Sequence, residues 1–145
     1  DIMANVKNIS SVIAELRKYG KEAEQLIDGI TEQSARKIEK DAKQEVNSKA
    51  SNFGKLGQSI NAFKEGKSNW IIRANAPYAA YVEFGTGGLV NVPTELKDIA
   101  ITWKGKGIRK INLRPRPYMY PALLKGRNEY LETLKKALSK YGNVK

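Results

Sequence analysis

One acidic residue stands alone inside an apolar block and is the first candidate for chemistry in this 145-residue chain. The block runs Tyr78-Ala79-Ala80-Tyr81-Val82-Glu83-Phe84-Gly85-Thr86-Gly87-Gly88. A buried carboxylate can act as a general acid or base, but it needs a partner to be stable there. We expect that partner to be Arg73 or an arginine of the segment Arg114-Pro115-Arg116-Pro117. Glu83 is therefore interpreted as a structural ion pair or an intersubunit contact.

The composition removes most catalytic chemistry, because the chain contains no His and no Cys. Disulfides, thiolate nucleophiles, imidazole bases and the usual zinc sites are thereby excluded. A catalytic site built from carboxylates alone is still allowed, with Glu83 as its residue. The sequence shows no second residue that would assist Glu83 in catalysis. We predict that the protein is not an enzyme and holds no metal or cofactor.

Two glycine clusters resemble phosphate loops only superficially. Gly85-Thr86-Gly87-Gly88 lacks the Gly-Lys-Ser/Thr ending of a P-loop, because Leu89-Val90 follow it. Gly105-Lys106-Gly107 has no third glycine opening a helix behind it. Both clusters are predicted to be turns.

The aromatic residues of the block allow two interpretations. Tyr78, Tyr81 and Phe84, with Val82 among them, follow helical spacing, which is typical of core residues. They also suit an aromatic binding surface. Tyr78, Tyr81, Glu83 and Phe84 are retained as candidates for docking to a partner or to another subunit.

The net charge of +11 is concentrated in the last third of the chain. Residues 1–50 carry nine basic and nine acidic residues, residues 51–90 four and two, and residues 91–145 thirteen and four. Such asymmetry indicates an acidic protein or a polyanion as partner, or simply a solvated face. The candidate docking residues of this third are Trp103, Lys104, Lys106, Arg109, Lys110, Arg114 and Arg116. Lys104, Lys106, Arg109 and Lys110 could face DNA, without sequence-specific recognition.

Apolar residues recur at helical spacing in three places. They predict a helix over 8–19 that ends at Gly20, a long helix over about 21–48, and a last helix from Pro121 to Gly142. Pro77 is expected to open a further short helix through the block.

Strand signals occur twice. Residues 58–65 and 69–75 are predicted to form a hairpin through Gly66-Lys67-Ser68, and residues 49–57 a turn before it. Ile99, Ile101 and Trp103 alternate, as do Ile111 and Leu113, so a second hairpin is expected within a stretch, 87–117, of little helical signal. The fold class is α+β, with a small antiparallel sheet packed against N-terminal helices and a C-terminal helix.

We expect a single domain over residues 3–145, with Asp1-Ile2 as an addition before Met3 and residues 86–117 as an extended basic docking loop. No run approaches the roughly 18 apolar residues of a membrane span, and no signal-peptide pattern opens the chain. We therefore expect no membrane partner.

Two blocks, in this order, resemble a known family. They are Tyr78-Ala79-Ala80-Tyr81-Val82-Glu83-Phe84-Gly85-Thr86-Gly87 and, about thirty residues later, Arg116-Pro117-Tyr118-Met119-Tyr120-Pro121-Ala122-Leu123. With the helices and the Trp70-Ile71-Ile72 strand before them, they are similar to the tail-completion, or head–tail joining, proteins of long-tailed bacteriophages. The resemblance spans roughly residues 10–140.

The resemblance implies a structural role without catalysis. Such proteins form a ring, of six copies, in the virion neck between the head connector or adaptor and the tail terminator or tube. It implies that the chain binds itself and these partners, that DNA passes through the ring, and that the chain resides in the host cytoplasm during assembly. A non-specific nucleic-acid-binding protein is the alternative that the basic third leaves open.

Overall fold

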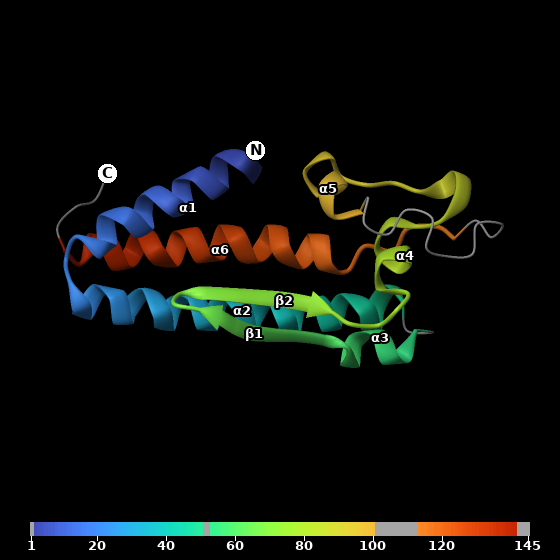
Figure 1. Ribbon diagram of the computed structural model, residues 1–145, viewed down its shortest axis with the longest axis horizontal. Helices are drawn as coiled ribbons and strands as arrows, with labels where there is room; N and C mark the ends of the chain where they lie inside the picture. The colour runs from blue at the N-terminus through green and yellow to red at the C-terminus, as the bar shows by residue number, and fades with distance from the viewer. Residues whose placement is uncertain (1, 51–52, 101–112, 142–145) are drawn as a thin grey trace. The chain divides into compact units, whose positions relative to one another are not determined.

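A computed structural model describes residues 2–50, 53–100 and 113–141. Its longer helices are α1 (Ile2–Arg17), α2 (Lys21–Lys49) and α6 (Met119–Ser139) (Figure 1). Strands β1 (Ile60–Gly66) and β2 (Asn69–Ala74) form a two-stranded sheet. The short helical elements are α3 (Gly54–Gln58), α4 (Ala79–Phe84), η1 (Gly87–Leu89), η2 (Thr94–Leu96) and α5 (Lys97–Ala100). The α+β fold class is confirmed.

The chain forms two compact units, and α2, the hairpin and α6 contribute residues to both. The first comprises Asp1–Lys40, Ala62–Ile72 and Ala122–Lys145, and the second comprises Asp41–Asn61 and Arg73–Pro121. The single domain over residues 3–145 stays a prediction.

The first unit is built on a helical core. Its buried members come from α1, α2 and α6, which run alongside one another in Figure 1: Leu16, Ile27, Ile30, Leu134 and Ala137. Tyr19 and Tyr141 stack beside this core with ring centroids 4.5 Å apart. These apolar positions recur at helical spacing, which is why the sequence predicts the helices that bury them.

A glycine lets α2 and α6 approach closely within this unit. A Cβ atom on Gly126 would clash with Cγ1 of Ile38, so no larger side chain fits without movement. One turn further along α6, the hydroxyls of Tyr130 and Thr31 are hydrogen-bonded at 2.6 Å. Lys37 and Glu129 add an ion pair between the two helices. The leucines of the last helix do not predict this contact.

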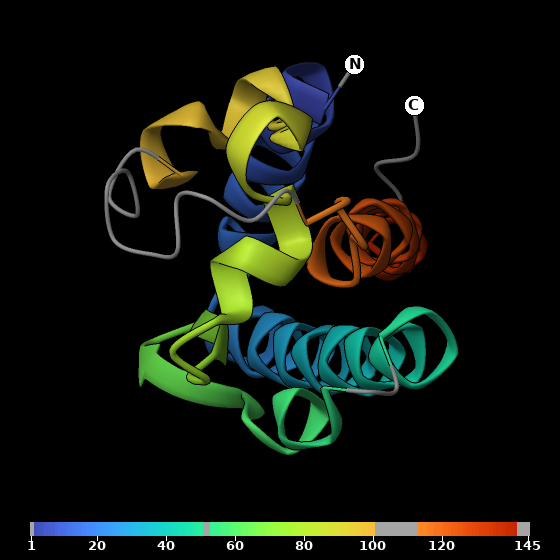
Figure 2. The ribbon, with the colours of Figure 1, turned by 90° about the vertical axis from the view of Figure 1, so that its right-hand side faces the viewer.

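The hairpin lies against one side of α2 (Figures 1 and 2). Ala62 of β1 is buried, and its N–H donates to the carboxylate of Glu39 on α2. The Arg36 guanidinium lies 5.0 Å from the centre of the Trp70 ring. The predicted hairpin is confirmed, but Gly66 belongs to β1, so the turn consists of Lys67 and Ser68, with Ser68 at a φ of +56°.

Several boundaries differ from the expectation. The first helix begins at Ile2 rather than at residue 8, and α3 occupies part of the predicted turn 49–57. The last helix begins at Met119, two residues before Pro121. Proline is tolerated there because the first four N–H groups of a helix have no intrahelical partner.

The described residues of the stretch 87–117 do not support the expected second hairpin. Ile99 lies in the helix α5 and Leu113 in no strand, whereas Ile101, Trp103 and Ile111 lie outside the described residues. Two more short helical turns, η1 and η2, also occur where little helical signal was expected. Pro93 and the acidic Glu95 and Asp98 favour a helix start, and this outweighs a brief alternation of isoleucines.

Candidate functional site

The apolar block forms the short helix α4 in the second unit, as Pro77 led us to expect. Ala79, Ala80, Val82 and Glu83 are its buried residues. Gly85 ends the helix with a φ of +81°, a conformation that favours glycine. A Cβ atom on Gly85 would lie 2.6 Å from the carbonyl oxygen of Leu113. Two separate features therefore require glycine at position 85: its positive φ and the nearby carbonyl oxygen of Leu113.

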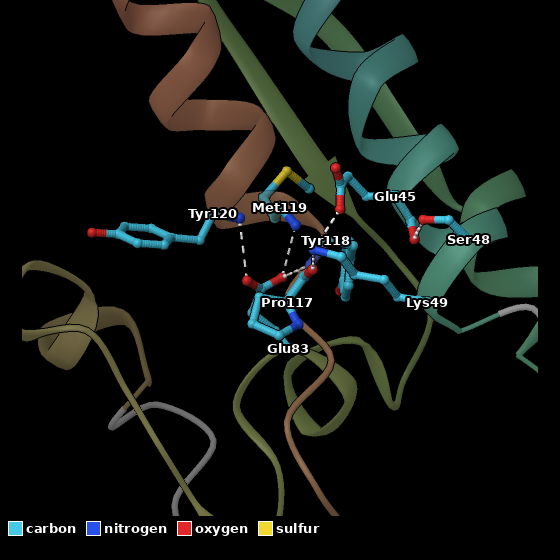
Figure 3. A network of polar contacts seen from close by, with 8 residues as sticks. All are labelled: Glu45, Ser48, Lys49, Glu83, Pro117, Tyr118, Met119 and Tyr120. Carbon is cyan, nitrogen blue, oxygen red and sulfur yellow. Dashed lines mark hydrogen bonds and ion pairs between the residues drawn. The ribbon is translucent and has the colours of Figure 1, made fainter.

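Glu83 receives three backbone N–H groups at the start of α6 (Figure 3). Its Oε1 accepts from Met119 at 2.8 Å and from Tyr118 at 3.2 Å, and its Oε2 accepts from Tyr120 at 3.2 Å. Glu83 is only 6 % exposed. A carboxylate is well placed at a helix N-terminus, where free N–H groups and the helix dipole both favour negative charge. The acid of the first block thus caps the helix that the second block opens.

Burial and hydrogen bonding act on the pKa of Glu83 in opposite directions. Burial raises the pKa of the Glu83 carboxyl, and the three N–H groups and the Lys49 ammonium oppose that rise without cancelling it. Lys49 itself pairs with Glu45 at 2.6 Å and donates to the Pro117 carbonyl oxygen at 3.3 Å (Figure 3). The cation that acts on Glu83 is therefore Lys49, where we had expected Arg73, Arg114 or Arg116. The expected arginine pair is replaced by helix amides.

Tyr118 completes the joint between the two blocks, by which we mean the hydrogen bonds that link α4 to the start of α6. It is 2 % exposed, and its hydroxyl donates to the Ala79 carbonyl oxygen at 2.8 Å. Burial, with the nearby Glu83 charge, raises the pKa of the Tyr118 hydroxyl, which stays protonated and able to donate. In addition, the Arg116 N–H donates to the Val82 carbonyl oxygen at 2.8 Å. The two blocks form one bonded substructure.

Thr86 and Leu113 are bonded to each other just beyond this joint. The Thr86 N–H donates to the Leu113 carbonyl oxygen at 2.9 Å, and the Leu113 N–H donates to the Thr86 hydroxyl at 2.8 Å. The Tyr120 hydroxyl also donates to the Glu95 carboxylate. The two ends of the segment between Thr86 and Leu113 are therefore held together at the joint.

The remaining predicted docking residues are placed as follows. Tyr78, Tyr81 and Phe84 are half-buried, so none is a fully buried core residue, and the Tyr78 ring lies 5.6 Å from that of Phe53. Arg114 is exposed, and the Arg116 guanidinium lies 5.8 Å from the centre of the Phe53 ring. The other five lie outside the described residues: Trp103, Lys104, Lys106, Arg109 and Lys110.

The joint offers little to a substrate. Both oxygens of Glu83 are engaged by amides, and no group of three or more metal-ligating side chains occurs in the part of the chain that the structure describes. Lys49 and Tyr118 were missed in the sequence. The order of the two blocks was the available signal for Tyr118, but nothing marks a lysine that bonds a distant carbonyl oxygen.

The fold and the site define a small α+β protein in which the motif around Glu83 bonds α4 to the start of α6. A family model described as "Bacteriophage HK97-gp10, putative tail-component" matches residues 10–85. The chain belongs to this family, which gives it a structural role in the tail of a bacteriophage virion. No curated protein and no solved structure matches the chain. None of the helices within the described ranges is long and apolar enough to cross a membrane.

Proposed function

We propose that the chain is a neck subunit that joins the DNA-filled head to the tail. In this role copies of it form a ring, six by the resemblance, between the head connector or adaptor and the tail terminator or tube. The protein acts by shape and docking and performs no chemistry. DNA passing through the ring meets it through non-specific phosphate contacts.

One observation carries the proposal: the two blocks of the head–tail joining resemblance are bonded to each other. The family match ends at residue 85, whereas the second block begins at Arg116. Glu83 nevertheless holds the first N–H groups of α6, and Thr86 is bonded to Leu113. A fixed base of this kind favours a docking role for the segment between the blocks, because order that is present beforehand lowers the cost of binding.

Disruption of the gene tests the proposal. Filled heads and complete tails should accumulate separately, and addition of the purified protein should join them into infectious particles. An extract that lacks only the tail tube provides the control, since the protein should not restore joining there. Normal joined particles formed without this protein would contradict the proposal.

The charge distribution favours a second candidate, a non-specific nucleic-acid-binding protein. Residues 91–145 carry nine more basic than acidic residues. Binding to DNA should then weaken steeply as salt rises, because each neutralised phosphate releases counterions. Charge reversal at Arg109, Lys110 and Arg114 should weaken it further. No DNA binding at low salt would remove this candidate.

A further inference from the structure

Residues 86–96, which we call the arm, are fixed at the middle and near the far end as well as at the first residue. In the middle, the Asn91 N–H donates to the Phe84 carbonyl oxygen at 2.8 Å. Near the far end, the Glu95 carboxylate accepts a hydrogen bond from the Tyr120 hydroxyl. All of these residues belong to the second unit. The arm therefore has a fixed conformation in the single chain.

The apolar side chains of the arm divide between an inner and an outer side. Val92, Pro93 and Leu96 are half-buried, whereas Leu89 and Val90 are 44 % and 53 % exposed. Single exposed hydrophobic residues are normal on protein surfaces, but two adjacent ones gain more from burial. Because they lie on a fixed turn, a partner can bury them without first having to order the backbone. Leu89 and Val90 are therefore the contact residues that the arm offers.

The charge of the arm restricts the kind of partner. Residues 84–94 contain no charged side chain, and the basic residues of the stretch 86–117 begin only at Lys97. DNA phosphates and acidic proteins are bound chiefly through Lys and Arg, so neither matches Leu89 and Val90. An apolar protein surface does match them, because the core of a protein interface is depleted in charged residues.

Two places where a second copy of the chain could receive these side chains are charged. Phe63, the remaining large exposed hydrophobic residue of the described chain, shares its strand with Lys64 and Glu65. The groove between α2 and α6 is lined by Lys37 and Glu129, which form an ion pair there. Neither place matches an uncharged apolar pair, which favours a different protein as the occupant.

We propose that Leu89 and Val90 insert into an apolar, uncharged recess of a neighbouring neck protein other than this chain. Burial of the two side chains supplies the affinity. The hydrogen bonds at Asn91 and Glu95 hold the arm in its binding conformation, which lowers the entropy lost on docking. The inference rests on the proposed function and names the chemistry of one of its contacts.

Charges of both signs at one position test the contact when purified protein joins separated heads and tails. Val90→Asp and Val90→Lys should leave the unfolding transition unchanged, because Val90 is exposed. Each should raise the protein concentration needed for half-maximal joining by about tenfold or more, the factor expected when one aliphatic side chain is no longer buried. Thr94→Asp and Thr94→Lys introduce the same charges at an exposed position of the arm and should join normally.

The sign of the charge distinguishes the partners. An apolar recess rejects both substitutions at Val90, whereas DNA or an acidic protein would reject the aspartate and accept the lysine. Normal or improved joining by Val90→Lys would overturn the inference and leave the proposed function intact. Equal losses from the Thr94 variants would overturn it as well. Joining that needs no copy of the protein would instead contradict the proposed function.

Photochemical cross-linking identifies the occupant, because the chain has no cysteine of its own. Val90→Cys is labelled with a benzophenone maleimide and assembled into particles, and the irradiated necks are analysed by mass spectrometry. The cross-link should join position 90 to an apolar segment of a different neck protein. Lys64→Cys, an exposed position on β1 with the same label, is the control and should not give this product.

Three results of the cross-linking would overturn the inference: a product only with a second copy, a product only with DNA, or no product. The same product from the Lys64→Cys control would overturn the assignment to the arm. Necks that lack the protein would contradict the proposed function.

Discussion

Glu83 Oε1 accepts the Met119 N–H at 2.8 Å and so joins α4 to the first turn of α6. The two residues are 36 positions apart, and each belongs to one block of the family resemblance. A helix end that is capped by a distant acid cannot move independently of that acid. The block around Glu83 is therefore a structural joint, and its acidic residue serves the fold.

Removal of this cap should destabilise the protein. Glu83→Ala leaves three N–H groups at the start of α6 without their acceptor. We expect the free energy of unfolding to fall by about 2–4 kcal/mol, because a buried donor without a partner costs roughly 1–3 kcal/mol. Urea denaturation followed by circular dichroism measures the change. Glu65→Ala, at an exposed position of β1, should change stability by less than about 0.5 kcal/mol; equal effects of the two substitutions would contradict the role of Glu83.

The same residue should give stability a distinct pH dependence. Burial raises the pKa of the folded-state Glu83 carboxyl above its ordinary value of 4.5. The folded state then binds the proton more tightly than the unfolded state, so the contribution of Glu83 is largest below pH 4.5 and is lost as pH rises through its folded pKa.

Denaturation across this range, in parallel with Glu83→Gln, isolates the contribution. The wild-type stability should fall relative to that of the variant as pH rises from 4.5, the ordinary pKa of a glutamate, through the folded pKa. A relative rise over the same window would mean that the helix amides lower the pKa of Glu83 more than burial raises it.

Two helix glycines should respond oppositely to the same substitution. Gly126→Ala forces a Cβ atom against Ile38 and should destabilise by about 1–3 kcal/mol through overpacking. Gly29→Ala, on the exposed side of α2 with nothing within 4 Å, should stabilise by up to about 1 kcal/mol. Thermal unfolding compares them. The account of the α2–α6 contact would be wrong if both changes stabilised the protein.

A second glycine pair tests the base of the loop. Gly85→Ala meets the Leu113 carbonyl oxygen and strains a φ of +81°, so we expect a loss of at least about 2 kcal/mol. Gly88→Ala has open space around it and should be nearly neutral. Hydrogen exchange at the Thr86 and Leu113 amides should quicken in Gly85→Ala alone. Unchanged exchange there would separate Gly85 from the Thr86–Leu113 pairing.

Patterns local in sequence predicted much of the fold. The long stripe of α2 predicted its helix from Lys21 almost to its end, and Gly66-Lys67-Ser68 marked the hairpin turn. Alternation over only a few residues was a weaker signal, and Ile99 lies in a helix for that reason. A short run cannot distinguish a strand from a helical turn when flanking residues favour a helix start.

The candidate site was predictable only in part. The isolated acid in an apolar block correctly indicated a buried carboxylate with partners. Its partners are backbone N–H groups of Tyr118, Met119 and Tyr120, and every residue except proline carries such a group. Side-chain types therefore pointed to arginine. Gly126 was missed for a similar reason, since close helix approach depends on what faces the glycine.

Electron microscopy of necks from intact virions tests the central claim most directly. Symmetric reconstruction, with the protein labelled at its C-terminus, should show a ring of label between the head connector and the tail tube. The described helices and the β1–β2 hairpin should fit each repeated density. Label found only elsewhere in the virion, or necks without the protein, would contradict the assignment of this tail component to the head–tail joint.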